Sequence, residues 1–164
     1  MYTLLVASLN ENVKLAKVLE AQLKALNTQT MMVNLVDLNL PMYSSREEEK
    51  GIPQVVHELV KTLESSKGYI VIAPEYNYSM PPVLTNVVAW ISRVDPKFRK
   101  YFEDKHILLA THSGGGGADV LRDMRNQFTK LGADVLEEEI LTTYKKPLDE
   151  VYSKEVLEML LAKG

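Results

Sequence analysis

The sequence contains no cysteine, and this absence removes several classes of protein at once. Disulfide scaffolds, thiolate nucleophiles, zinc ribbons and cysteine-ligated clusters are all excluded. An excess of charge of one sign is missing as well, because the net charge is only -3 over 164 residues. Such a balance argues against a nucleic-acid partner bound through phosphate neutralisation, and it falls short of the strongly acidic surface of a dedicated electron carrier. No apolar run approaches the ~20 residues of a membrane span, so no membrane partner is expected.

Motifs of other chemistries are also missing. The sequence has neither Gly-x-x-x-x-Gly-Lys-Ser/Thr nor Gly-x-Gly-x-x-Gly, so it carries neither a nucleoside-triphosphate loop nor a dinucleotide fingerprint. No Ser-His-Asp set can be assembled by spacing, which gives hydrolase chemistry little support. The first residues, Met1 to Ser8, lack a basic leader. We interpret them as a strand rather than a signal peptide, and the expected location is the cytoplasm.

What the chain does contain is an ordinary globular composition, 46% hydrophobic and 25% charged, at a length that suits one domain over residues 1–164. Strand and helix patterns alternate along it. Strands are expected at 2–7, 30–37, 69–73, 106–111 and within 134–143, helices at 11–27, 52–66, 82–93, 118–131 and 148–163, and a loop at about 38–51 whose charged run 46–50 is either solvated or the start of a helix. This alternation predicts an α/β fold, the flavodoxin-like three-layer αβα sandwich with a five-stranded parallel sheet of order 2-1-3-4-5.

Three of the expected strand-to-helix loops carry residues suited to a ligand. The first loop, Ala7 to Lys14, leads into a helix whose unpaired N–H groups favour phosphate. The side chains of Ser8, Asn10 and Asn12 could donate hydrogen bonds to phosphate oxygens. One of them could instead simply cap the helix, since Ser and Asn are preferred caps.

The second loop, Pro74 to Pro82, combines two aromatics, an amide and three prolines. Proline limits the entropy of a loop, so Tyr76, Asn77 and Tyr78 can be held in place before a ligand arrives. A planar ring can then stack on the aromatic side chains. The alternative is a surface turn whose tyrosines pack on the domain or on another subunit.

The third loop, Thr111 to Ala118, contains four consecutive glycines. These are costly in conformational entropy, so they indicate a positive φ or a close approach of the backbone to a ligand. Their N–H groups could bond the carbonyl and nitrogen edge of a ring system, although a permissive strand-to-helix turn is the alternative. His112 alone gives only weak support for catalysis.

The three loops follow the first, third and fourth strands, which are neighbours about the switch point of the expected sheet. A phosphate at the first loop and a flat ring between the second and third loops describe a mononucleotide with a large aromatic head. FMN fits that shape.

These same residues resemble the NADPH-dependent FMN reductase family of the flavodoxin-like superfamily. The family's hallmark is Pro-Glu-Tyr-Asn-x-Ser-x-Pro-x-x-Leu-x-Asn, and residues 74–86 match it at every fixed position. A Ser-x-Gly-Gly type loop after the fourth strand is matched by Ser113 to Gly117. The resemblance covers nearly the whole chain in element order and spacing. It implies an NAD(P)H-dependent flavin oxidoreductase that transfers hydride from NADPH or NADH to FMN, and on to a flavin, quinone or similar acceptor.

Carried over position by position, the resemblance implies an FMN site built from all three loops. Its residues are Ser8, Asn10, Asn12 and Val13 around the phosphate, Pro74, Glu75, Tyr76, Asn77 and Tyr78 beside the isoalloxazine, and Ser113, Gly114, Gly115 and Gly116 at the pyrimidine edge. Hydride transfer requires no acid–base side chain, so no catalytic residue and no metal are expected. The nicotinamide is expected to stack near Tyr78 and His112.

The chain departs from the family pattern in two places. The family's phosphate loop usually has a Gly-Ser start, an arginine and a second serine, whereas this loop begins Ala7-Ser8, is shorter and has no arginine. The loss of a bidentate contact to phosphate implies weaker FMN binding, or a flavin that is exchanged as a substrate. Tyr78 stands where a small residue is more usual.

The helix expected at 82–93 points to an oligomer. It is apolar nearly all round, through Val83, Leu84, Val87, Val88, Ala89, Trp90 and Ile91. A helix of this kind is buried on both sides, so a homodimer or homotetramer through it is expected, as the resemblance also implies. Loops of the same chain are the alternative cover.

Two other functions stay open, a non-enzymatic FMN-binding electron carrier of flavodoxin type and a flavin-free scaffold of the same fold.

Overall fold

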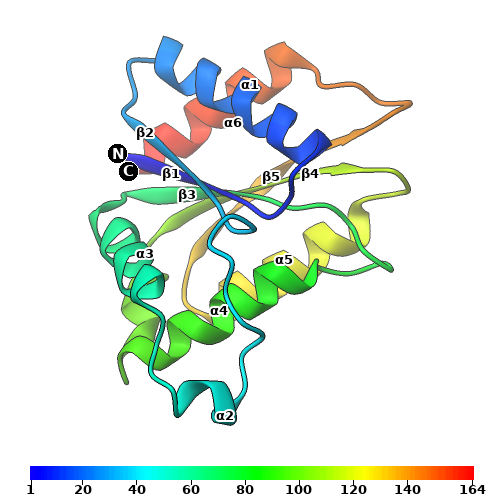
Figure 1. Cartoon of the computed structure of the whole chain (residues 1–164). Coiled ribbons are helices and arrows are strands. Elements are labelled where there is room, and N and C mark those ends of the chain that lie inside the picture. The colour runs from blue at the N-terminus through cyan, green and yellow to red at the C-terminus, as the bar shows by residue number, and fades with distance from the viewer.

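A computed structural model describes residues 1–164 and shows a five-stranded sheet between two layers of helices (Figure 1). The strands are β1 (Tyr2–Val6), β2 (Thr30–Asn34), β3 (Gly68–Ile72), β4 (His106–Ser113) and β5 (Asp134–Thr143). The helices are α1 (Glu11–Ala25), α2 (Ser45–Glu48), α3 (Gln54–Ser65), α4 (Pro82–Val94), the 3-10 helix η1 (Phe98–Tyr101), α5 (Ala118–Lys130) and α6 (Glu150–Lys163). None of these helices has both the length and the apolarity needed to cross a membrane.

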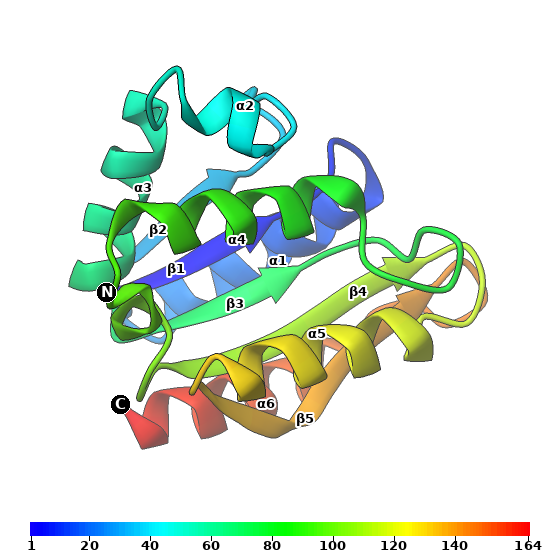
Figure 2. The same ribbon diagram turned by 90° about the horizontal axis from the view of Figure 1, so that it is seen from below.

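The sheet has the predicted topology. All of its strand pairs are parallel and the order is β2-β1-β3-β4-β5, which confirms the expected fold class. Every residue of β1 and β3 is buried, as is typical of parallel strands covered on both faces. Helices α1 and α6 cover one face, and α3, α4 and α5 cover the other (Figures 1 and 2). The loops that follow the strands therefore gather at one end of the sheet, on the right in Figure 1.

Side chains alternate across the sheet and build two cores. The larger one, of 24 residues on the side of α3, α4 and α5, includes Trp90, Tyr69 and Phe102. The smaller one, of 16 residues on the side of α1 and α6, includes Leu19 and Ile70. Truncation of a fully buried leucine such as Leu19 costs about 2–5 kcal/mol, so these cores hold the sheet edge rigid beneath the loops.

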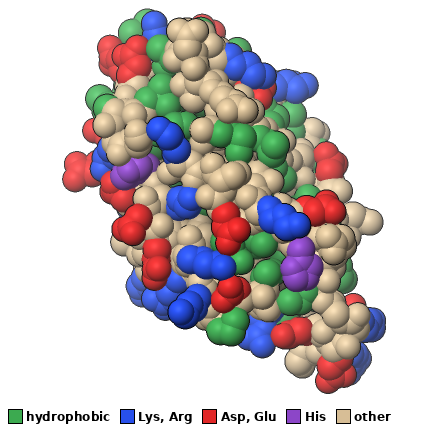
Figure 3. Space-filling model, turned by 90° about the vertical axis from the view of Figure 1, so that its left-hand side faces the viewer, with side chains coloured by type: hydrophobic (Ala, Val, Ile, Leu, Met, Phe, Trp, Pro, Cys, Tyr) green, Lys and Arg blue, Asp and Glu red, His purple; other side chains and the backbone are tan.

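The end of the molecule that carries both chain termini faces away from those loops. Its Lys, Arg, Asp and Glu side chains are interspersed rather than gathered by sign (Figure 3). This end therefore presents no surface dominated by charge of one sign. The residues expected to bind a ligand lie at the opposite end, where the loops gather.

The structure places the ends of two strands differently from the expectation. Strand β2 ends at Asn34 rather than at residue 37, because residues 35–38 form a turn. Strand β4 continues to Ser113, two residues beyond the expected end at Thr111, so His112 and Ser113 belong to the strand and not to the third loop. The reason is that β5 runs alongside and pairs as far as Ser113 with Thr143. The expected loop 38–51 contains the short helix α2, which is the second of the two alternatives for its charged run. The cap residue Ser44 accepts a hydrogen bond from the Glu47 N–H.

The outer side of α4 is covered partly by the segment before α2. The Asn86 Nδ2 donates to the Pro41 carbonyl at 3.0 Å, and its Oδ1 accepts from the Tyr43 N–H at 2.7 Å. The Trp90 Nε1 donates to the same Pro41 carbonyl at 2.8 Å. The Tyr43 ring packs edge-on against Trp90, with ring centroids 5.2 Å apart. A loop of the same chain, which was the alternative to a partner subunit, therefore covers α4 at Asn86 and Trp90.

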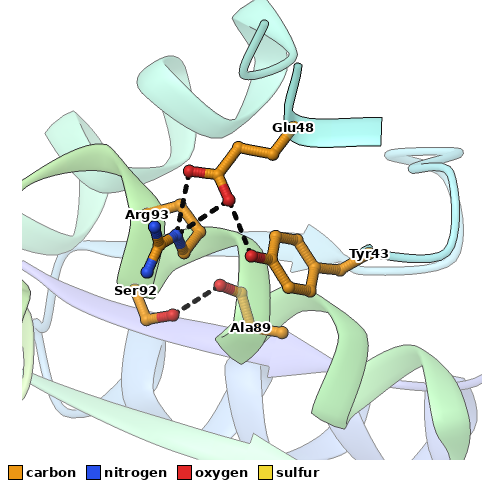
Figure 4. Close-up of polar contacts among 5 residues, drawn as sticks. All are labelled: Tyr43, Glu48, Ala89, Ser92 and Arg93. Atoms are coloured by element: carbon orange, nitrogen blue, oxygen red, sulfur yellow. Dashed lines mark hydrogen bonds and ion pairs between the residues drawn. The ribbon is translucent and has the colours of Figure 1, made fainter. Parts of the chain in front are cut away.

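Glu48 closes this cover from α2 (Figure 4). The Tyr43 hydroxyl donates to Glu48 Oε2 at 2.7 Å, and the Arg93 Nε lies 3.0 Å from both carboxylate oxygens. The hydrogen bonds from Tyr43 and then from Arg93 hold the pKa of Glu48 below its ordinary value. The segment between β2 and α3 is thereby fixed to α4.

Candidate functional site

The three loops singled out in the sequence do meet at one edge of the sheet. Loop one (residues 7–10) follows β1, loop two (73–81) follows β3, and loop three (114–117) follows β4. The hydrogen-bond ladder extends into the first two, since Ala7 N–H donates to the Ile72 carbonyl at 2.9 Å and Ala73 N–H to the Ala110 carbonyl at 3.2 Å. The starts of loops one and two are therefore fixed by the same kind of backbone hydrogen bonds that hold the strands together.

A pocket of about 320 Å³ lies between loop one and loop two. It is lined by Ala7, Ser8, Leu9, Asn10, Val36, Tyr76, Pro81, Pro82 and Val83. Its size is at the lower end of the range for small-ligand sites, and mostly apolar walls with a few polar groups are typical of them. Loop three lies outside this lining.

Loop one leaves the start of α1 open. Asn10 occupies the cap position and makes no side-chain cap hydrogen bond, so the alternative of a simple capping residue does not apply. The Ser8 Oγ accepts from the Asn10 N–H at 3.3 Å. The first N–H groups of a helix have no partner within it, and an uncapped start is ready to accept an anion.

Asn12 has a structural task that the sequence did not reveal. It is 2% exposed, its Nδ2 donates to the His112 carbonyl at 2.9 Å, and its Oδ1 accepts from the His112 N–H at 2.7 Å. Its side chain thus joins the start of α1 to the end of β4. The Val13 N–H donates to the Asn10 carbonyl at 2.9 Å. Of the four residues expected around a phosphate, Ser8 and Asn10 line the pocket, whereas Asn12 and Val13 do not.

Loop two contains a two-residue turn. The N–H of Tyr76 donates to the Ser79 carbonyl and the N–H of Ser79 to the Tyr76 carbonyl, both at 3.0 Å. Asn77 and Tyr78 between them have φ of 48° and 63°. This is the geometry of a type I′ turn, in which asparagine and glycine are favoured. A tyrosine there is strained by roughly 1–2 kcal/mol, and the Tyr78 side chain is 77% exposed.

The fixed residues of the 74–86 motif tie loop two to α5. The Glu75 Oε2 accepts from the Val120 N–H at 3.2 Å, in the first turn of α5, where the cap residue Gly117 has no side chain to offer. The Ser79 Oγ donates to Asp123 Oδ2 at 2.7 Å. The last asparagine of the motif bonds the segment before α2, as described above. The side chains of these motif residues therefore hold loop two in place through contacts within the chain. The backbone of the loop remains available to contact a ligand.

Loop three contains glycines that the packing of the chain does not explain. Gly117 has φ of 85°, and a Cβ there would lie 3.1, 3.2 and 3.3 Å from side chains of β4 and β5. A Cβ on Gly114 or Gly116 would meet nothing within 4 Å, and neither residue has a left-handed φ. Their N–H groups form no hydrogen bond within the chain, whereas the Gly115 N–H donates to the Ser113 Oγ at 3.1 Å. The alternative of a permissive turn thus accounts for Gly117 alone.

His112 lines a hollow beside α1, together with Glu11 and Lys14. Its Nδ1 lies 3.0 Å from the Thr142 Oγ1, and its ring packs edge-on against Tyr144 with centroids 4.9 Å apart. It does not line the pocket between loops one and two. Tyr78 does not line that pocket either, and the stacking of a nicotinamide near Tyr78 and His112 stays a prediction.

Two residues at the end of β2 were missed by sequence reasoning. Val36 lines the pocket, and the Asn34 side chain supports it by donating to the Ser8 carbonyl at 2.8 Å and accepting from the Val36 N–H at 3.0 Å. The signal was an asparagine inside an otherwise apolar run, which is unusual for the interior of a strand.

The sequence model of the NADPH-dependent FMN reductases matches residues 3–146. The chain belongs to this family. A quinone reductase from Escherichia coli K12 is 32% identical over 101 residues, covering 60% of this chain and 52% of that protein, so the chain spans about half the length of the curated relative.

Solved structures share the fold over the whole chain. FerB, a flavoenzyme NAD(P)H:(acceptor) oxidoreductase from Paracoccus denitrificans, has a TM-score of 0.81 at 21% identity, covering 98% of this chain and 94% of its own. An FMN-dependent NADH-azoreductase from Bacillus anthracis, in complex with FMN, has a TM-score of 0.68 at 15% identity, covering 99% and 98%. At these identities the likeness shows the architecture.

Proposed function

We propose that the chain binds FMN where its three loops meet and acts as an NAD(P)H-dependent flavin oxidoreductase, with a flavin, quinone or similar acceptor. Loop three carries this proposal. The fold has room for a side chain at Gly114 and at Gly116, yet both positions are glycine. The N–H groups of both residues have no hydrogen-bond partner within the chain. Both features are accounted for by a ring system whose polar edge approaches the backbone closely.

Loops one and two fit the rest of such a molecule. Ser8 and Asn10 present side-chain donors beside the open start of α1, and the Asn12 N–H of that first turn would be offered to the phosphate, whereas the Val13 N–H is already bonded to the Asn10 carbonyl at 2.9 Å. Pro74 to Tyr78 would lie beside the isoalloxazine, held in place by Glu75. Ser113 to Gly116 would hold the pyrimidine edge.

The bound flavin would supply the two-electron chemistry, and the chain would supply orientation. Glu75 lies beside loop three, where a Cβ on Gly115 would be 3.9 Å from its Oε1, and its Oε2 accepts a hydrogen bond from the Val120 N–H at 3.2 Å, so its carboxylate positions loop two against α5. The apolar wall formed by Val36, Pro81 and Val83 would keep water from one side of the pocket. No side chain is assigned a proton-transfer role, since hydride transfer needs none.

The test is a titration of the purified protein with FMN, followed by oxidation of NADPH and NADH with free FMN or a benzoquinone as acceptor. We expect saturable binding and flavin-dependent oxidation. Failure to take up FMN under native conditions would overturn the proposal. Binding without NAD(P)H oxidation would point instead to an electron carrier.

A homodimer or homotetramer through α4 is also part of the proposal. It is supported by Val83 and Ala89, which stay half-buried on α4, and by the exposed rings of Tyr76 and Tyr78. Sedimentation as a monomer at micromolar concentration would remove it. A cytoplasmic location stays a prediction from the sequence.

A further inference from the structure

A second hollow begins at loop two and runs along α5. It has a volume of about 430 Å³, and we call it the α5 groove. Met80 of loop two, Asp123, Gln127 and Lys130 of α5, and Arg99 of η1 are among the residues that line it. In Figure 2, α5 extends from the end where loops two and three lie to the end where η1 lies. None of these residues lines the pocket between loops one and two.

The groove carries positive charge that the chain leaves unpaired. Neither Arg99 nor Lys130 forms an ion pair within the chain. Asp123, the carboxylate in the groove, is already engaged by the Ser79 hydroxyl at 2.7 Å and by an Arg122 nitrogen at 3.4 Å. An anionic group is therefore favoured at the end of the groove where Arg99 and Lys130 lie.

The flavin site has the opposite balance. The loops and the helix starts around it contain the carboxylates of Glu11, Glu75 and Asp119. Lys14 is bound to Glu11 at 2.7 Å and Arg122 to Asp119 at 2.7 Å, which leaves Glu75 without a cation. A ligand with a neutral ring at one end and phosphates further along would match both regions. A phosphorylated nicotinamide dinucleotide has this distribution of charge.

The distances along α5 suit such a ligand. With a rise of 1.5 Å per residue, Lys130 lies ~10 Å along the helix from Asp123 and ~18 Å from Ala118, which begins the helix next to loop three. Asp123 is in turn fixed to loop two through Ser79. The groove therefore leads from the edge of the flavin site to the two free cations.

Gln127 adds a second requirement for a ligand. Its Oε1 is buried and has no hydrogen-bond donor within the chain. An amide oxygen in this state calls for an N–H or O–H group, and an adenine amino group or a ribose hydroxyl supplies one. Met80 and Leu131 provide apolar surface for a ring beside it.

We propose that the α5 groove binds the adenosine-phosphate half of NADPH, with Arg99 and Lys130 on its 2′-phosphate. The proposal rests on the proposed function, because it assumes that the nicotinamide meets a flavin at the loops. Arginine suits a phosphate through its bidentate donors, and lysine adds a point charge. NADPH is then preferred over NADH.

Two measurements test the groove. Steady-state kinetics of the FMN-loaded protein compare the KM for NADPH with that for NADH, and calorimetry compares binding of 2′,5′-ADP with that of 5′-AMP, which needs neither flavin nor turnover. We expect Arg99→Gln and Lys130→Gln each to raise the KM for NADPH and to weaken 2′,5′-ADP by about tenfold, with NADH and 5′-AMP nearly unchanged. Lys97→Gln is the matched control, because Lys97 is exposed, close to Arg99 in the chain and outside the groove.

Each outcome decides something. Equal losses for NADPH and NADH, or no loss at all, would overturn the assignment of the groove. Dissociation of an oligomer by Arg99→Gln, with the NADPH to NADH ratio unchanged, would show a subunit contact in its place. Binding of 2′,5′-ADP that depends on Arg99, in a protein that oxidises neither dinucleotide, would leave the groove assigned and remove the proposed function.

Discussion

Replacement of Gly116 by alanine should weaken ligand binding without lowering the stability of the fold. The added Cβ would meet nothing within 4 Å, and the backbone is not in the left-handed region. Alanine at such a position stabilises a protein by about 0.4–1 kcal/mol, because the unfolded chain loses freedom. The unliganded Gly116→Ala protein should therefore unfold at a urea concentration equal to or above that of the parent.

The same methyl group should obstruct the flavin. It would stand where the ring edge approaches the backbone, and we expect FMN affinity to fall at least tenfold, about 1.4 kcal/mol, in a fluorescence titration. Gly117→Ala is the structural control. Its φ of 85° costs roughly 1–2 kcal/mol for alanine, before the contacts of its Cβ are counted. The reasoning is refuted if Gly116→Ala loses as much stability as Gly117→Ala, or if its FMN affinity is unchanged.

Three further changes test the frame around the site. Asn86→Ala removes two hydrogen bonds and leaves the Tyr43 N–H without its acceptor, so it should cost about 2–4 kcal/mol in urea unfolding; a loss below 1 kcal/mol would contradict this. Tyr78→Gly should raise stability by about 1 kcal/mol through relief of a φ of 63°, and a lower melting temperature would show that the ring is held by contacts. Glu48 has a lowered pKa, so its contribution to stability is present above the ordinary carboxyl pKa and is lost as the pH falls through the lowered value. Glu48→Gln should accordingly flatten the acid side of the melting temperature profile, and an unchanged profile would count against the contact with Arg93.

Periodicity located all five strands and their order because each strand is a compact apolar run separated by an amphipathic helix. It placed the end of β4 two residues too early, since His112 and Ser113 are too polar to look like a buried strand. They are in the strand only because β5 continues beside them. Helix α2 spans four residues, which is too short for a helical period to show.

The site was predictable in its loops but less so in its contacts. The spacing of the 74–86 motif located loop two, and the glycine run located loop three. The side chain of Asn12 was assigned to a phosphate, because nothing in the sequence shows a partner 100 residues away. Likewise the four glycines look equivalent in the sequence, and only the backbone angles and the surrounding space distinguish Gly117 from Gly116.

The pair of hydrogen bonds between the Asn12 side chain and the His112 backbone also has a dynamic consequence. The His112 amide proton can exchange with deuterium only when the Asn12 side chain releases it, and this side chain is buried between α1 and β4, so the proton should be among the slowest to exchange. Loops one and three then open only as parts of one cooperative unit. Fluctuations that admit a ligand are left to the Tyr76–Ser79 hairpin, whose amides should exchange without unfolding of the sheet.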